Sequence, residues 1–180
     1  MTLPTFDFEE KFWNENYLVI GVDEVGRGAL AGPIYVGAVV YDHKRVKREK
    51  NKIMQFGIND SKQLSIKKRE QLSDKILRLS VNHSVGFSTV ANINKYGIVK
   101  SVQQAIRSAV NTLLTSVAKN QKVFLLMDAF TCPYLKNIGL NNQLGIIKGD
   151  CQSISIASAS IIAKVARDAH MKELAQAYPV

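Results

Sequence analysis

Two adjacent carboxylates, Asp23 and Glu24, end an apolar run and are followed at once by the turn Gly26-Arg27-Gly28. Consecutive residues of a regular strand point to opposite faces, so the two acids share a site only where the strand bends or ends. Glycine supplies that break, since it tolerates positive φ and lets another backbone come near. A guanidinium and free backbone amides suit a phosphate group. The segment therefore combines metal-binding oxygens with a place that a phosphate can approach.

Two further aspartates stand where apolar runs end. Asp128 follows Val123–Met127, and Asp150 follows a lysine and a glycine just before a helical pattern. Taken singly, Asp128 is an ordinary strand cap and Asp150 an ordinary N-cap or first-turn acid of a helix. Together with the first pair they predict several carboxylates in one pocket. Their mutual repulsion raises each pKa, and a divalent cation relieves it.

The chemistry that fits such a pocket is metal-assisted hydrolysis. Carboxylate oxygens are hard ligands of the kind that Mg²⁺ and Mn²⁺ prefer, and two such ions can drive in-line displacement at a phosphodiester. No histidine is needed, and His43, His83 and His170 stand in contexts that indicate no catalytic role. The two cysteines, Cys132 and Cys151, form no CxxC pair, so the sequence predicts no zinc site.

The charge of the chain favours a polyanionic partner. Its 180 residues include 24 Lys and Arg against 15 Asp and Glu, which gives a net charge of +9. Charge alone leaves open a basic protein that binds no nucleic acid. The N-terminus lacks the regions of a signal peptide, and no apolar run approaches the ~20 residues of a membrane helix. We therefore expect a cytoplasmic protein with no membrane partner.

Strands and helices alternate along most of the chain. Apolar runs predict strands over Leu18–Val22, Ile34–Tyr41, Val81–Val90, Val123–Met127 and Leu144–Ile147, and helical spacing predicts helices after the N-cap Ser65 and over Ile98–Val117 and Ser153–Met171. The basic run 43–52 looks like an exposed loop, and residues 1–16 look like a leader anchored by aromatic side chains (Phe6, Phe8, Phe12 and Trp13). This order predicts one α/β layered domain over 1–180.

At this point the motifs resemble a known family. Asp23–Gly28, with Leu30–Pro33 after it, resembles the signature of ribonuclease HII. Three further segments follow in the family's order: Asn59–Ser65 is similar to its Asp-Ser-Lys-Lys-Leu-Ser stretch, Met127–Ala129 to its strand-ending aspartate, and Lys148–Asp150 with Ser155–Asp168 to its last catalytic segment. The match begins at Leu18 and spans nearly the whole chain. It implies an RNase H-like fold, with a central mixed β-sheet flanked by α-helices.

The resemblance also implies an activity and a set of catalytic residues. The family consists of endoribonucleases that cleave RNA in RNA–DNA hybrids and 5′ of single ribonucleotides in duplex DNA, by two-metal-ion hydrolysis that leaves 3′-hydroxyl and 5′-phosphate ends. The positions of Asp23, Glu24, Asp128 and Asp150 then bind Mg²⁺ or Mn²⁺ and are catalytic. The expected partner is such a nucleic acid, bound by a monomer.

Substrate contacts are implied for a second set of residues. The turn Gly26, Arg27 and Gly28 is expected to sense the ribose 2′-hydroxyl, the group that distinguishes RNA from DNA. Ser61 and Lys62 are expected to hold substrate phosphates. Asp168 is implied as a further acid near the metals, and its alternative interpretation is an acid of a surface ion pair.

The chain departs from the family pattern in three places. Gln63 replaces a usual lysine, and Ala129 stands where glycine is commoner. The family also continues through a C-terminal segment whose tyrosine stacks on the deoxyribose beside the junction, and we expect that segment to be absent here. Two other functions therefore stay open: a noncatalytic hybrid-binding protein, and another two-metal nuclease of ribonuclease HIII-like or junction-resolving type.

Overall fold

A five-stranded mixed sheet forms the centre of the computed structural model, which describes residues 3–117 and 120–178. Its order is β3-β2-β1-β4-β5. The strands are β1 (Leu18–Val25), β2 (Ile34–Val40), β3 (Asn82–Ser88), β4 (Val123–Asp128) and β5 (Gln143–Ile146). β2 runs antiparallel to β1 and β3, whereas β4 runs parallel to β1 and β5. The predicted mixed sheet is confirmed.

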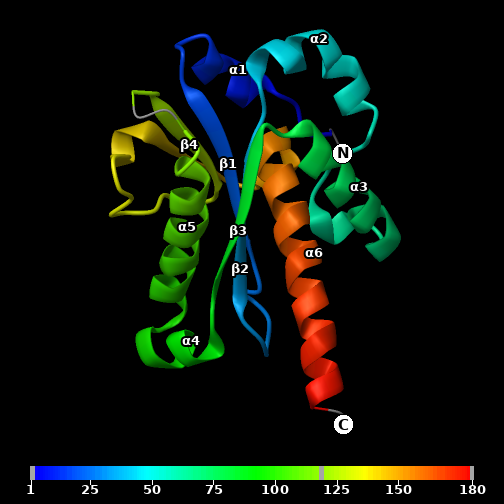
Figure 1. Cartoon of the computed structure of the whole chain (residues 1–180), viewed down its shortest axis with the longest axis vertical. Helices are drawn as coiled ribbons and strands as arrows, with labels where there is room; N and C mark the ends of the chain where they lie inside the picture. The colour runs from blue at the N-terminus through cyan, green and yellow to red at the C-terminus, as the bar shows by residue number, and fades with distance from the viewer. Residues whose placement is uncertain (1–2, 118–119, 179–180) are drawn as a thin grey trace.

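Helices cover both faces of this sheet. They are α1 (Asp7–Trp13), α2 (His43–Met54), α3 (Ile66–Leu79), α4 (Val90–Tyr96), α5 (Ile98–Leu114) and α6 (Ile154–Ala177), with short 3₁₀ turns η1 (Ser61–Gln63), η2 (Leu140–Asn142) and η3 (Gly149–Cys151). In Figure 1, α5 lies on one side of the sheet and α6 on the other. Each face has its own apolar core. Within the described ranges, no helix is long and apolar enough to cross a membrane.

α6 lies very close to the sheet because both partners carry small residues there. A Cβ added to Gly21 of β1 would collide with the backbone of Ser155, and one added to Gly37 of β2 would collide with the carbonyl of Ala159. The first ten residues of α6 are all buried, although three of them are serines. This close approach fixes α6 relative to the end of β1, where Asp23 and Glu24 lie.

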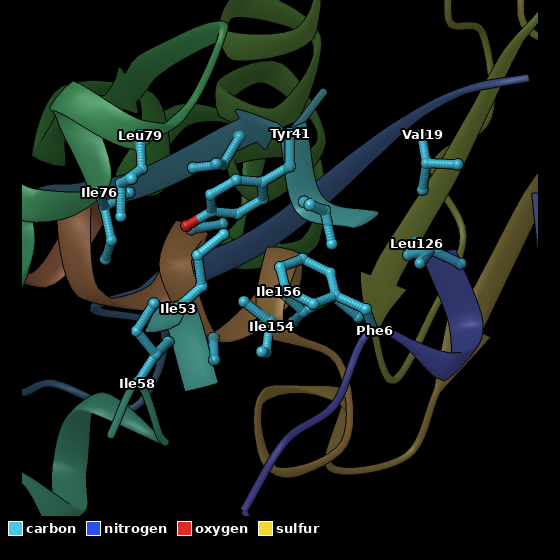
Figure 2. Packing of buried hydrophobic residues seen from close by; sticks show 14 of the residues in the cluster. Phe6, Val19, Tyr41, Ile53, Ile58, Ile76, Leu79, Leu126, Ile154 and Ile156 are labelled. Atoms are coloured by element: carbon cyan, nitrogen blue, oxygen red, sulfur yellow. The ribbon is translucent and has the colours of Figure 1, made fainter. Parts of the chain in front are cut away.

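The N-terminal strap, residues Thr5 to Glu9, ties the start of the chain to the start of α6. The Thr5 amide donates to the Gln152 carbonyl and the Ile154 amide donates to the Thr5 carbonyl, both at 3.0 Å. Figure 2 shows Phe6 of the strap beside Ile154, with which it shares an apolar core. Residues far apart in the sequence therefore hold the segment that directly follows Asp150.

Glu9 completes the strap as a fully buried carboxylate. Its Oε1 atom accepts hydrogen bonds from the Ser153 hydroxyl at 2.7 Å and from the Ser155 amide at 2.8 Å. Burial raises the pKa of Glu9, and these hydrogen bonds oppose the shift. A carboxylate at the first turn of a helix also suits the positive end of the helix dipole. Ser153, and not Asp150, is the N-cap of α6.

The basic run 43–52, which the sequence predicts as a loop, is part of helix α2, so that prediction is wrong. The Asp42 carboxylate accepts from the Arg45 amide at 2.6 Å and caps the helix. Val46 and Ile53, seven residues apart, are buried on one side. With only two buried apolar residues among many cations, the helical pattern in the sequence is weak. The N-cap and the packing of those two residues stabilise the helix nevertheless.

The other predicted elements are recovered with shifts at their ends, and two helices were not predicted: α1, which lies within residues 1–16, and α4. α4 begins after the N-cap Thr89 inside the stretch predicted as the end of a strand, and it buries no residue of its own. Of the aromatic side chains expected to anchor residues 1–16, Phe6, Phe12 and Trp13 are buried, and Phe8 packs against the same core. Residues 1–2 of that leader lie outside the described residues.

Candidate active site

Sheet topology brings the four predicted carboxylates to one edge of the sheet. β1 and β4 are parallel neighbours with Val22 opposite Met127, so Asp23 and Asp128 follow at the same level. β5 runs parallel beside β4, and η3 with Asp150 comes shortly after it. The carboxyl ends of neighbouring parallel strands are where open α/β sheets place their ligands. The candidate site therefore lies where theory expects it.

The pKa shifts show that these carboxylates act on one another. Burial raises the pKa of Asp23 well above its usual value, and the charges of Glu24, Asp128 and Asp150 raise it further. Burial likewise raises the pKa of Glu24 to about 7, with a contribution from Asp128, while Arg27 opposes the shift. Such a set of crowded oxygens is what a divalent cation stabilises, so the donor set fits Mg²⁺ or Mn²⁺.

Asp128 also fixes the loop that carries Asp150. Its Oδ1 atom accepts a hydrogen bond from the Gly149 amide at 2.7 Å. Lys148, just before, adopts a left-handed conformation with φ 54°, as does Ala129 with φ 63°. A cavity of about 670 Å³ opens at this point, and both Asp128 and Asp150 line it. The two aspartates therefore face the same space.

Asp60 and Cys151 belong to this site, and sequence reasoning missed both. Ligand atoms of Asp60, Asp150 and Cys151 all lie within 4.8 Å of one another. Burial raises the pKa of Asp150, and the nearby charge of Asp60 raises it further. Asp60 also caps η1 by accepting from the Lys62 amide at 2.8 Å. The available signal for Asp60 is its place in the Asn59–Ser65 motif, in which only Ser61 and Lys62 are predicted to contact the substrate.

The two predicted phosphate contacts have different places in the structure. Lys62 lines the cavity, and although burial alone would lower its pKa, the aspartates around it raise it. Ser61 is buried and does not face the cavity, because its hydroxyl hydrogen-bonds the Ser160 hydroxyl at 2.9 Å. Ser160 in turn lies close enough to Asp23 to lower the pKa of that carboxyl. The Ser61 hydroxyl thus packs behind Asp23, and a contact of Ser61 with substrate stays a prediction.

The Gly-Arg-Gly turn leaves β1 beside the same carboxylates. Arg27 forms an ion pair with Glu24 at 3.6 Å, and its guanidinium lies 5.1 Å from the ring centroid of Phe130. Gly26 needs its glycine because its φ is 104°, whereas a side chain on Gly28 would meet open space. Phe130 was not predicted, since an aromatic residue two positions after Asp128 carries no signal of its own. The turn is therefore closely packed at Gly26 and open to solvent at Gly28.

Asp168 is not brought to the four carboxylates. On α6 it pairs with Lys164 at 2.6 Å and with Arg69 at 3.6 Å, and all three line a second, separate cavity between α3 and α6. Asp168 lies eight residues after Ser160, which corresponds to roughly 12 Å of helix. Helical rise separates it from Asp23, so the structure supports the ion-pair interpretation of this residue.

Metal binding at the candidate site is expected to depend strongly on pH. Asp23 and Glu24 have raised pKa values, and a cation binds their deprotonated forms, so binding must release protons below about pH 7. We expect the affinity for Mn²⁺ to rise from pH 6 to pH 8, by up to about tenfold per unit for each proton released. Isothermal titration calorimetry in two buffers of different ionisation enthalpy measures both the Mn²⁺ affinity and the number of protons released. Asp168→Asn should show the same dependence, and an affinity independent of pH would contradict the expectation.

Known proteins resemble this chain over most of its length. A family model described as Ribonuclease HII matches residues 20–179. Ribonuclease HII of Caldicellulosiruptor bescii is 40% identical over 97% of this chain, and that of Fusobacterium nucleatum is 45% identical over 99%. The chain spans 77% and 76% of these two relatives, and 64% of a Lactobacillus helveticus relative that is 42% identical.

Solved structures agree on the fold. Ribonuclease H2 from Pyrococcus horikoshii matches with a TM-score of 0.66 and 28% identity, covering 89% of this chain and 76% of that chain. Bst-RNase HIII in complex with Mn²⁺ matches with a TM-score of 0.74 and 24% identity, covering 90% of this chain and 55% of that chain. The predicted RNase H-like fold is therefore confirmed. With these matches and the ordered motifs, the chain belongs to the ribonuclease HII family, a family of type II ribonucleases H.

Proposed function

We propose that this protein is a metal-dependent endoribonuclease that cleaves RNA in RNA–DNA hybrids and cuts 5′ of a single ribonucleotide in duplex DNA. The observation that carries the proposal is the convergence of Asp23, Glu24, Asp128 and Asp150 at one edge of the sheet, where burial and neighbouring carboxylates raise the pKa values of Asp23, Glu24 and Asp150. Family membership supplies the substrate class. The net charge of +9 suits the polyanionic substrate.

The four carboxylates would hold two Mg²⁺ or Mn²⁺ ions. Bound there, the ions supply an activated water and neutralise the charge that develops on the departing 3′ oxygen. Ser160 lies beside Asp23, and the Gly149 amide orients Asp128 by donating to its Oδ1 atom. Lys62 adds a positive charge on the cavity wall for a substrate phosphate. Hydrolysis leaves a 3′-hydroxyl and a 5′-phosphate.

The turn Gly26-Arg27-Gly28 is proposed to recognise the ribose. Its open side at Gly28 lets a sugar–phosphate backbone approach the main chain, and it leaves β1 directly after the catalytic pair. A 2′-hydroxyl both donates and accepts hydrogen bonds, so backbone amides and carbonyls can read it. Arg27 is held by Glu24 and Phe130, which limits the directions that its guanidinium takes.

One cleavage assay tests the function. The protein is incubated with Mg²⁺ or Mn²⁺ and, in parallel, with a DNA duplex that contains one ribonucleotide, an RNA–DNA hybrid and a four-way DNA junction. We expect cleavage 5′ of the ribonucleotide and within the hybrid, no cleavage of the junction, and none when EDTA replaces the metal. Binding without cleavage would support a noncatalytic hybrid-binding protein, and cleavage of the junction alone would support a resolvase.

A further inference from the structure

Arg167 of α6 is a buried cation, 7% exposed, whose hydrogen bonds go to main-chain carbonyls. Its Nε atom donates to the Pro33 carbonyl at 2.9 Å and its Nη2 atom donates to the Ala31 carbonyl at 2.7 Å. Among residues 3–117 and 120–178, no carboxylate lies within ion-pair distance of it. The guanidinium is therefore committed to the segment Gly26–Pro33, which we call the recognition loop.

Two glycines of the recognition loop are shaped by this helix. A Cβ on Gly26 would lie 2.6 Å from Arg167 Nε and 2.8 Å from the Pro33 carbonyl oxygen. A Cβ on Gly32 would lie 3.2 Å from Arg167 Nη2 and would collide with Met171. Both glycines also have positive φ, 104° and 88°. The inner side of the recognition loop thus packs against the Arg167 guanidinium, which contacts the loop both at its beginning and at its end.

The outer side of the recognition loop has little to hold it. Leu30 is fully exposed, and a side chain at Gly28 would meet open space. Within the loop, the Ala29 amide donates to the Gly26 carbonyl at 3.1 Å. A loop with so few apolar contacts takes its position from its polar ties, and those made by a charged donor are about twice as strong as neutral ones.

We infer that Arg167 is a positioning residue that sets the recognition loop at a fixed place relative to the catalytic carboxylates, and so determines discrimination between ribose and deoxyribose. The inference rests on the proposed function. Its basis is that α6 contacts both parts: Ser160 lies beside Asp23, and Arg167, seven residues later, donates to two carbonyls of the loop. Seven residues correspond to roughly 10 Å of stiff helix. Arg167 does not touch the substrate itself.

The test measures discrimination and metal binding in the same variants. In an Asp128→Asn background, which prevents cleavage, dissociation constants are measured for a DNA duplex with one ribonucleotide and for the all-DNA duplex of the same sequence. Arg167→Met removes both hydrogen bonds, and Arg167→Lys keeps the charge and one donor group. Lys172→Met, on the exposed face of the same helix, is the matched control for loss of one positive charge.

We expect Arg167→Met to reduce the preference for the ribonucleotide duplex by about tenfold or more, as the loss of charge-assisted hydrogen bonds implies. Arg167→Lys should show a smaller loss, and Lys172→Met none. Mn²⁺ affinity is measured in the same variants with Asp128 restored, and it should stay unchanged in every one of them. If Arg167→Met does not fold by circular dichroism, Arg167→Lys decides the matter alone.

Two results would overturn the inference. Folded Arg167 variants that keep the full preference would remove the residue from discrimination. An equal fall in Mn²⁺ affinity and in ribonucleotide binding would show that Arg167 stabilises α6 in general and has no specific effect on discrimination. Failure of the proposed function looks different, because the protein with Arg167 intact would then show no preference for the ribonucleotide duplex at all.

Discussion

Asp128→Asn is expected to abolish cleavage of a ribonucleotide-containing duplex while leaving its binding intact. The substitution keeps the shape of the side chain and one oxygen that can accept from the Gly149 amide, so the loop that carries Asp150 stays in place. It removes one of the negative charges that we propose hold the metals. Loss of an outer-shell partner of a metal ligand already costs roughly 10- to 100-fold in activity or affinity, and loss of a ligand should cost more.

Single-turnover cleavage with Mg²⁺, together with binding to the same duplex, measures this effect. Asp23→Asn should behave alike, because both carboxylates belong to the same cluster. Asp168→Asn is the matched control, since that carboxylate pairs with Lys164 and Arg69 instead. If Asp128→Asn retains most of its cleavage with Mg²⁺ present, the assignment of these residues as metal ligands fails.

Gly37→Ala is expected to cause a large loss of stability, because it adds a methyl group where the sheet touches the backbone of α6. The new Cβ would collide with the carbonyl of Ala159, and neither backbone can turn aside as a side chain would. Overpacking a core costs about 1–3 kcal/mol and occasionally more, so we expect about 3 kcal/mol. For a domain of this size that lowers Tm by roughly 10 °C.

Thermal unfolding followed by circular dichroism measures that loss. Gly139→Ala is the matched control, because Gly139 has an ordinary φ of −70° and a Cβ there would meet nothing within 4 Å. The control should unfold within about 0.5 kcal/mol of the parent. Gly37 lies opposite Asp23 in the β1–β2 pairing, so surviving Gly37→Ala protein should also cleave more slowly. Equal stability of the two variants would show that α6 can move away from the sheet.

Most of the fold was predictable from the sequence because its strongest signals are local. The run Leu18–Val22 and the helical repeat over Ile98–Val117 each bury their own apolar residues, and the structure has a strand and a helix there. α2 was not predictable in the same way. Whether this segment forms a helix depends on the cap at Asp42 and on the packing of Val46 against distant parts of the chain. The hydropathy pattern contains neither.

The candidate site divides along the same line. Asp23, Glu24, Asp128 and Asp150 carried a recognisable pattern of acids at the ends of apolar runs, and the structure brings them together. The contribution of Asp60, by contrast, depends on how η1 packs beside η3, a contact between segments about 90 residues apart.

Ser61 shows the limit of motif reasoning most clearly. A serine beside a lysine in a phosphate-binding motif indicates a substrate contact, yet its hydroxyl points inward to Ser160. Which of two neighbouring side chains faces the cavity depends on the backbone of a 3₁₀ turn, and residue types alone do not determine that. Arg167 was hidden for the same reason, because a cation in a helix is ordinary until its carbonyl partners on the recognition loop are known.

The N-terminal strap also bears on how the protein is made. Thr5 and Glu9 leave the ribosome long before Gln152–Ser155, yet their long-range hydrogen bonds go to that late segment. Contacts of such high sequence separation form slowly, because a long loop must close first. During synthesis the strap therefore has no partner until residues 152–155 have emerged, and only then can it hold the turn with Asp150. A growing chain would thus complete its candidate active site late, after all five strands of the sheet have been made.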